Sequence, residues 1–131
     1  VAQEIISEAM RIADIALPTF PDEQALFGDK DAGTCADRLS ALGVKEIVVK
    51  DGKEPALVVS DNNRETVPSV VAQAVDTTGA GDSFNGAYLA ARLKGLSPVQ
   101  AAHKAHRVAA RVVEIRGALA PMETARAAFA D

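Results

Sequence analysis

Two glycines, an alanine and an aspartate stand side by side in this sequence, and their order suits phosphate chemistry. Gly79, Ala80 and Gly81 carry little or no side chain, and Asp82 follows them directly. Where such a run opens a helix, its backbone N–H groups stay uncovered and the positive end of the helix dipole attracts an anion. Asp82 would repel a bound phosphate, so its carboxylate suits proton transfer better. It could take the proton from an attacking hydroxyl while the amides stabilise the transferring phosphoryl group.

A plainer interpretation of the same residues stays open at this point. The run could be an ordinary strand-to-helix turn in which Asp82 only completes the helix N-terminus. Glycine spacing alone does not decide between the two, because short glycine motifs are weak evidence. A P-loop is excluded, since no Lys-Ser or Lys-Thr pair follows the glycines.

The elements that must position this run alternate between strands and helices. An apolar extended segment over 70–75 leads into it, and a helix over 80–94 follows. Ser97 and Pro98 carry the signals that cap and open the next helix, expected over 98–115. The other expected elements are helices over 1–13, 21–27, 31–42 and 122–129, strands over 14–17 and 46–50, a turn at Asp51-Gly52 and a hairpin over 56–67. This alternation predicts an α/β layered sheet within one domain.

Composition excludes several functional classes. The chain has 131 residues, of which 48% are apolar and 24% charged, and its formal net charge is −4. That balance indicates a globular protein and disfavours nucleic-acid binding, which needs clustered Lys and Arg. No apolar run reaches about 18 residues and the N-terminus lacks signal-peptide features, so we expect neither membrane insertion nor secretion. The single Cys35 fits a buried residue and a reducing, cytoplasmic setting.

The segment around Asp82 closely resembles a known signature. Residues 75–86 read Val-Asp-Thr-Thr-Gly-Ala-Gly-Asp-Ser-Phe-Asn-Gly, which is similar to the C-terminal motif of the ribokinase (PfkB) carbohydrate kinase family. The resemblance implies that Asp82 is the catalytic base, that Gly79, Ala80 and Gly81 form the anion hole, and that ATP with Mg2+ is the phosphoryl donor. It also implies a monovalent cation such as K+, held partly by Asp76 and Thr78, although Asp76 could instead cap the turn.

Two further segments match the family's nucleotide contacts. Lys50-Asp51-Gly52 stands where the family places a loop at a strand end, which assigns Gly52 to nucleotide binding. The family often has Thr where this chain has Lys50, so the nucleotide role transfers less well to Lys50 than to Gly52, and the alternative for Lys50 is a solvated lysine at the strand end. His106, Ala109 and Ala110 match the helix that lines the adenine pocket. Many members carry Asn in place of His106, and a lone His on a helix is often structural.

An acidic pair matches a segment that the family links to Mg2+. The family carries Asn-x-x-Glu after a proline, and here Thr19 replaces the Asn while Asp22 or Glu23 supplies the acid. The resemblance implies that Glu23 or Asp22 assists Mg2+ through water, because Mg2+ keeps several waters. Acidic residues at a helix start are also expected from the helix dipole alone.

The resemblance covers nearly the whole chain and implies a ribokinase-like three-layer α/β/α sandwich. Residues 1–131 would form a single partial domain, the nucleotide-binding and catalytic C-terminal portion, with the sugar pocket and lid on an N-terminal part outside it. Residues 17–23, 105–109 and 116–121 resemble the members that phosphorylate the C6 hydroxyl of 2-keto-3-deoxygluconate in the Entner–Doudoroff route.

The expected partners are therefore a small sugar or sugar acid and ATP, without nucleic acid or membrane. A homo-oligomer is a further expectation, because related kinases often dimerise through the lid. The alternatives are a kinase of the ribokinase or fructokinase type, an ATP- or anion-binding fragment that is inactive without its N-terminal half, and a purely structural fragment.

Overall fold

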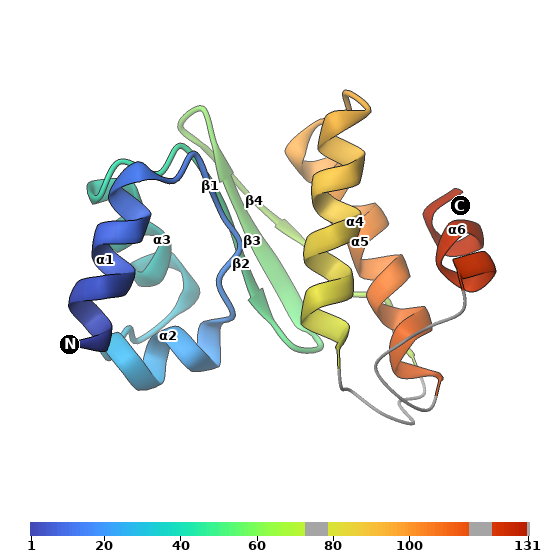
Figure 1. Ribbon diagram of the computed structural model, residues 1–131, viewed down its shortest axis with the longest axis horizontal. Helices are drawn as coiled ribbons and strands as arrows, with labels where there is room; N and C mark the ends of the chain where they lie inside the picture. Colours follow the sequence, from blue (N-terminus) through green and yellow to red (C-terminus); the bar gives the residue numbers. More distant parts are fainter. Residues whose placement is uncertain (73–78, 116–121, 131) are drawn as a thin grey trace. The chain divides into compact units, whose positions relative to one another are not determined.

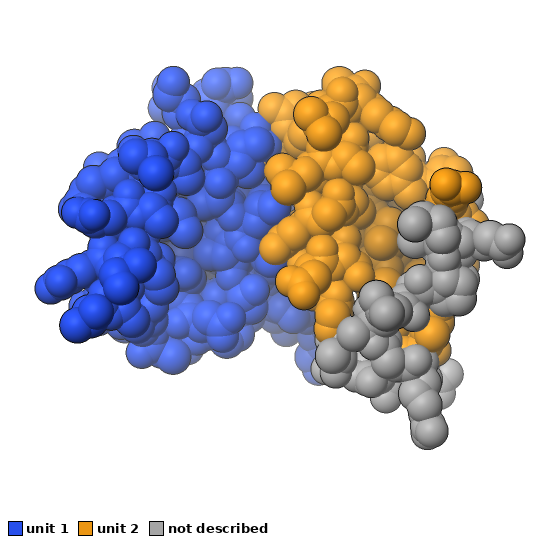
Figure 2. Space-filling view, viewed as in Figure 1, with its two compact units in different colours: residues 1–67 blue, residues 68–131 orange. Residues whose placement is uncertain are grey.

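The chain forms two compact units. The computed structural model describes residues 1–72, 79–115 and 122–130. Unit 1 comprises Val1–Val67 and unit 2 comprises Pro68–Asp131, coloured separately in Figure 2. The expectation of a single partial domain over 1–131 stays a prediction.

Unit 1 is built on a four-stranded sheet in the order β1-β2-β3-β4 (Figure 1). Its strands are β1 (Ile15–Ala16), β2 (Glu46–Asp51), β3 (Glu54–Ser60) and β4 (Asn63–Val67). β1 runs parallel to β2, and β2, β3 and β4 form an antiparallel meander. Asp61 and Asn62 both have positive φ angles, 50° and 66°, in the tight turn between β3 and β4, a conformation that Asp and Asn tolerate and that matches the strand twist.

Three helices of unit 1 lie on one face of this sheet: α1 (Ala2–Ile12), α2 (Phe20–Phe27) and α3 (Ala32–Ala41) (Figure 1). α3 begins at Asp31, whose carboxylate accepts the Thr34 N–H at 2.7 Å. Cys35 and Leu39 of α3 are fully buried against Ile47 and Val49 of β2. This cluster is the core that fixes α3 to the sheet, because burial of such side chains is the main favourable term in folding.

The described part of unit 2 consists of helices α4 (Ala80–Leu93), α5 (Pro98–Val113) and α6 (Met122–Ala130). α4 and α5 pack along each other through a face rich in alanine, which lets their backbones approach closely. Ser97 and Gln100 form the reciprocal capping box at the start of α5, with bonds of 3.2 Å and 3.0 Å. The helix start expected from Ser97 and Pro98 is thus confirmed.

Most expected elements are present, with differences at their ends. Helix α2 begins at Phe20, one residue before the expected Pro21, and the strand expected over 14–17 is reduced to Ile15–Ala16. Helix α3 ends at Ala41, one residue before the expected end at Leu42, and the chain turns at Gly43, whose φ is 103°. Residues 70–72 have no regular structure, and 73–75 lie outside the described residues.

Candidate active site

The start of helix α4 carries the predicted catalytic run. Gly79 has φ 79° and ψ 0°, in the left-handed region that glycine adopts without strain. The first intrahelical bond joins the Ser83 N–H to the Gly79 carbonyl at 2.9 Å, and among the described residues no side chain caps the helix start. The N–H groups of Ala80, Gly81 and Asp82 therefore have no acceptor within the helix. Amides of this kind at the positive end of a helix are suited to bind an anion, and α4 is 14 residues long.

Asp82 lies in the first turn of α4 and is exposed. Its carboxylate makes no ion pair among the described residues. Two positions further on, Phe84 is buried and stacks on Tyr88, with ring centroids 6.3 Å apart. Phe84 also contacts His106 of α5, so aromatic packing between the two helices lies two residues beyond the exposed carboxylate of Asp82.

The predicted adenine residues lie on α5. His106 is buried, and its ring forms a T-shaped contact with the ring of Phe84. The two ring centroids lie 5.0 Å apart, and the interplanar angle is 71°. Ala110 is also buried, whereas Ala109 is partly exposed. His106 thus packs between α4 and α5, which agrees with the structural interpretation of this residue, and an adenine contact stays a prediction. The predicted cation residues Asp76 and Thr78 lie outside the described residues.

The carboxyl ends of β1 and β2 bring other predicted residues together in unit 1. Gly52 is exposed in the β2–β3 turn with φ 56°. Thr19, just before α2, forms an isolated parallel bridge with Lys50, and the Lys50 N–H donates to the Pro18 carbonyl at 2.9 Å. Ligands in α/β sheets bind outside the carboxyl ends of strands, so this edge is where a nucleotide contact at Gly52 is expected.

The interpretation of Lys50 as a solvated lysine is wrong. Lys50 is only 8% exposed, and it makes an interaction beyond its backbone bond. Residues 46–50 of β2 are all buried, so both faces of this strand are covered up to Lys50, and the bridge to Thr19 extends the parallel pairing past β1 to the same point. The sequence alone favours solvent exposure for a lysine at a strand end, whereas the structure buries Lys50.

The two acids considered for Mg2+ differ in their surroundings. Glu23 is 8% exposed and its Oε2 lies 2.6 Å from Nη2 of Arg38. Asp22 is exposed in the first turn of α2. A carboxylate oxygen that faces water fits Mg2+ held through water, whereas Glu23 is already engaged by a guanidinium. Of the pair, Asp22 fits the ion better.

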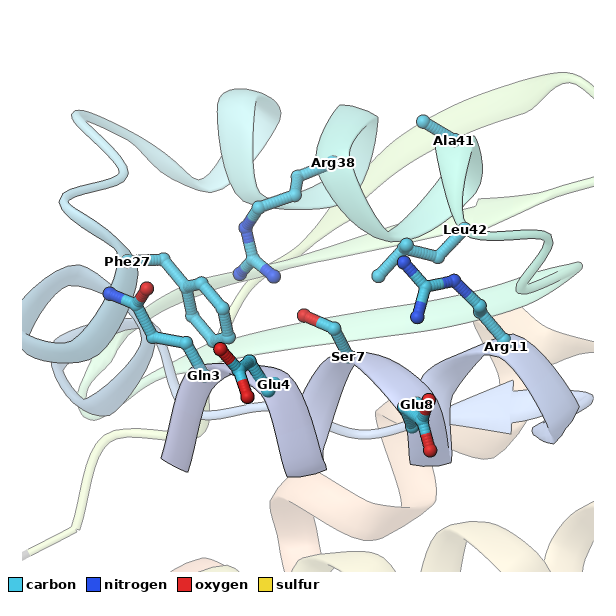
Figure 3. A pocket seen from close by; sticks show the side chains of 9 residues that line it. All are labelled: Gln3, Glu4, Ser7, Glu8, Arg11, Phe27, Arg38, Ala41 and Leu42. Atoms are coloured by element: carbon cyan, nitrogen blue, oxygen red, sulfur yellow. The ribbon is translucent and has the colours of Figure 1, made fainter. Parts of the chain in front are cut away.

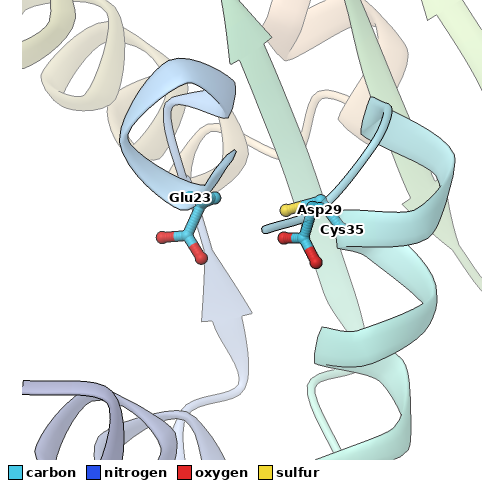
Figure 4. Close-up of side chains that lie close together, drawn as sticks. All are labelled: Glu23, Asp29 and Cys35. Atoms are coloured by element: carbon cyan, nitrogen blue, oxygen red, sulfur yellow. The ribbon is translucent and has the colours of Figure 1, made fainter. Parts of the chain in front are cut away.

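Glu23 belongs to a buried cluster that sequence reasoning missed. Figure 4 shows Glu23 of α2, Asp29 of the α2–α3 connection and Cys35 of α3 facing one another, with one ligand-type atom from each within 4.8 Å of the others. Arg38 also binds Asp29 through Nε and Nη2, at 3.1 Å and 2.8 Å. Burial raises the pKa of the Cys35 thiol to about 12, and the charges of Asp29 and Glu23 add to that rise. The thiol is therefore neutral and unreactive near pH 7, as expected for a buried cysteine.

A groove of about 650 Å3 lies beside this cluster, between α1 and α3. Figure 3 shows Arg38 from α3 and Ser7 from α1 pointing into it. Its remaining lining comes from Gln3, Glu4, Glu8, Arg11, Phe27, Ala41 and Leu42. None of the residues assigned above to catalysis, nucleotide or metal lines this groove, so it is not the predicted active site.

Comparison with known proteins now decides the family. Residues 2–125 match the model of the pfkB family of carbohydrate kinases. This chain belongs to the PfkB family. The match spans both units and includes α4 with Asp82, so the resemblance first seen in residues 75–86 is confirmed.

Curated relatives of this PfkB chain include kinases of a sugar acid. It is 39% identical over 125 residues to the 2-dehydro-3-deoxygluconokinase of Escherichia coli, covering 92% of this chain and 40% of that protein. The enzyme of the same name from Dickeya dadantii is 36% identical over 125 residues, which again cover 92% of this chain and 40% of that protein. The chain thus spans about 40% of the length of these relatives.

Solved structures agree in fold. A ribokinase from Thermotoga maritima has a TM-score of 0.83 at 31% identity, covering 95% of this chain and 45% of that one. An Escherichia coli ribokinase II candidate, solved in complex with ATP and Mg2+, also gives 0.83 at 27% identity, with coverage of 98% and 42%. The predicted α/β class and ribokinase-like fold are therefore confirmed. In residues 1–72, 79–115 and 122–130, no helix combines the length and apolar character needed to cross a membrane.

Proposed function

We propose that this chain is the nucleotide-handling part of an ATP-dependent sugar kinase, and that the full-length protein phosphorylates the C6 hydroxyl of 2-keto-3-deoxygluconate. The observation that carries the proposal is the start of α4, where exposed Asp82 follows amides that no side chain caps. The relatives named as 2-dehydro-3-deoxygluconokinases support the choice of acceptor, since 2-dehydro and 2-keto describe the same ketone.

In the proposed reaction, Asp82 takes the proton of the C6 hydroxyl as its oxygen bonds to the γ-phosphorus. The bond between that phosphorus and the bridging oxygen breaks, and ADP leaves with the electron pair. The N–H groups of Gly79, Ala80 and Gly81 are assigned to the phosphoryl oxygens, where fixed donors stabilise charge most effectively. Mg2+, when bound, offsets the negative charge of the triphosphate.

The remaining assignments are part of the same proposal. Gly52 contacts the nucleotide from the β2–β3 turn, and His106, Ala109 and Ala110 form the α5 side of the adenine site. Asp22 holds Mg2+ through water, in preference to Glu23, because Asp22 is the exposed carboxylate of the two. Asp76 and Thr78 are assigned to a monovalent cation such as K+.

A second candidate function is ATP or anion binding without catalysis. The short span of the chain against its relatives favours this for the isolated chain. It does not explain Asp82, because a carboxylate next to bound phosphates weakens simple binding through charge repulsion. The kinase proposal therefore accounts for one more residue than the binding proposal does.

A coupled assay of ADP release tests the acceptor. Full-length protein is supplied with ATP, Mg2+ and one of 2-keto-3-deoxygluconate, ribose, fructose or adenosine. We expect kcat/KM for 2-keto-3-deoxygluconate to exceed that for the other acceptors by at least about a hundredfold, since a site built for a carboxylate rejects ligands that lack it. The 6-deoxy form of the sugar acid, which has no C6 hydroxyl, is the matched control and should release no ADP.

Two results would contradict the proposal in different ways. Release of ADP only with ribose, fructose or adenosine would refute the acceptor and leave the kinase assignment standing. If the protein binds ATP but releases no ADP in the presence of any of the four acceptors, the kinase assignment itself is refuted.

A further inference from the structure

Helix α2 is held to unit 1 in an unusual way. An amphipathic helix normally attaches through a stripe of buried apolar side chains. In α2 the single buried residue is Glu23, a carboxylate, and the apolar Phe20 and Phe27 are only partly buried. The placement of α2 therefore depends heavily on what binds that carboxylate.

Arg38 of α3 is the group that binds it. Its Nη2 lies 2.6 Å from Glu23 and 2.8 Å from Asp29, and its Nε lies 3.1 Å from Asp29. Its guanidinium also lies over the Phe27 ring, 3.7 Å from the centroid. One side chain thus contacts α2 at Glu23 and at its last residue, Phe27, and also contacts the connection that follows the helix. Burial alone would lower the pKa of Arg38, but the hydrogen bonds that Arg38 donates to Asp29 and Glu23 raise it, so the guanidinium stays charged.

A contribution to stability does not by itself explain the buried ion pairs of Arg38 with Glu23 and Asp29. Two buried carboxylates face one guanidinium, and the third member of the cluster, Cys35, is a neutral thiol. Buried ion pairs lose much of their attraction to desolvation, and apolar residues of similar size often stabilise a fold equally well. A planar guanidinium instead provides orientation, because its N–H donors have a fixed arrangement and so fix the geometry of the carboxylates that it binds.

Helix α2, which Arg38 holds in this way, begins at the carboxyl ends of the strands, where the nucleotide is proposed to bind. The first turn of α2 follows Thr19, which is bridged to Lys50 at the carboxyl end of β2. The N–H groups of Asp22 and Glu23 both donate to the Thr19 carbonyl, each at 3.1 Å. Asp22 and Glu23 are neighbours on the helix, so a Glu23 held inward leaves Asp22 turned about 100° away, toward solvent.

We propose that Arg38 is a positioning residue: by holding Glu23 and Asp29, it fixes the first turn of α2 so that Asp22 faces the metal at the carboxyl ends of β1 and β2. This inference rests on the proposed function. It assigns Glu23 to the Arg38 cluster and leaves Asp22 as the acid that serves Mg2+.

The first test measures the position of α2 without any ligand. Arg38→Lys keeps the charge and removes the fork, so the full-length protein should still fold. We expect hydrogen exchange at the amides of residues 20–27 to accelerate by about tenfold or more, the equivalent of one lost charge-assisted hydrogen bond. Exchange in β2 should stay within twofold of the wild-type rate. Arg64→Lys is the matched control, because Arg64 makes an exposed ion pair with Asp37 in the same unit, and it should leave α2 unchanged.

The second test separates positioning from general loss of stability. Mn2+ serves as the probe for the Mg2+ site, and its binding to full-length protein with a non-hydrolysable ATP analogue is followed by electron paramagnetic resonance. Arg38→Lys should weaken Mn2+ binding by about tenfold, the lower end of the range for residues that orient a metal ligand. Leu39→Ala, which removes a fully buried side chain of the same helix, should lower stability and leave Mn2+ affinity unchanged.

The inference is overturned if exchange in α2 is the same in Arg38→Lys and wild type, or if Arg38→Lys and Leu39→Ala bind Mn2+ equally well. Failure of the proposed function looks different, because wild-type protein would then release no ADP with any acceptor while the exchange result would be unaffected.

Discussion

Gly79 and Gly95 adopt the same left-handed backbone conformation at opposite ends of helix α4, with φ angles of 79° and 90°. Gly79 starts the helix at the proposed anion hole, whereas Gly95 follows its last turn, where the Leu96 N–H donates to the Ala91 carbonyl at 3.1 Å. The two residues carry the same conformational demand, and only one of them lies at the proposed site.

Alanine at either glycine should therefore lower the free energy of unfolding by about 1 kcal/mol, the cost of a Cβ in the left-handed region. We expect Gly79→Ala to reduce kcat about a hundredfold as well, because small shifts of catalytic donors have effects of that size. Gly95→Ala should keep kcat within twofold of wild type. Urea denaturation and the ADP-release assay on full-length protein measure both quantities, and equal losses of kcat in the two variants would contradict the anion-hole assignment.

At the scale of elements, the capping box at Ser97 holds the start of α5. Ser97→Ala removes the acceptor for the Gln100 N–H, which should lower the free energy of unfolding by about 1 kcal/mol. The proposed site lies on other residues, so the KM for ATP should not change. Urea denaturation with circular dichroism tests this prediction. Ser40→Ala, at an exposed serine within α3, is the control and should leave the free energy of unfolding nearly unchanged.

The helices that sequence predicted best are those with local signals at their ends. Ser97 and Pro98 mark the start of α5, and Gly28 and Gly43 end α2 and α3 with positive φ angles of 75° and 103°. Such signals lie within a few residues of the structure they determine. The start of α4 is predicted equally well, because Gly79 and Asp82 lie only three positions apart in the sequence.

Contacts between distant residues could not be predicted in the same way. Arg38 meets Glu23 and Asp29 across a helix connection, and no periodic pattern relates three charged residues at those spacings. Lys50 was placed in solvent because a charged residue at a strand end is usually exposed. Lys50 is nevertheless buried, and its bridge partner Thr19 lies 31 positions away, a contact that only the fold creates.

At the scale of the whole molecule, residues with a proposed role occur in each of the two units. Asp82 and the α4 amides belong to unit 2, while Gly52 and Asp22 belong to unit 1. The chain spans about 40% of its curated relatives, so the sugar acid is proposed to be bound largely by residues of the full-length protein outside residues 1–131. Activity is therefore a property to be measured on the full-length kinase.

The central claim is that Asp82 acts as the base of a sugar kinase, and Asp82→Asn in the full-length protein tests it most directly. Asn keeps the shape of the side chain and cannot accept the proton. We predict that kcat falls by at least about a hundredfold, the usual scale for a lost general base, while the dissociation constant for ATP stays within threefold of wild type. Asp61→Asn, in the exposed β3–β4 turn, is the matched control and should retain full activity. Near-normal kcat in Asp82→Asn would contradict the account.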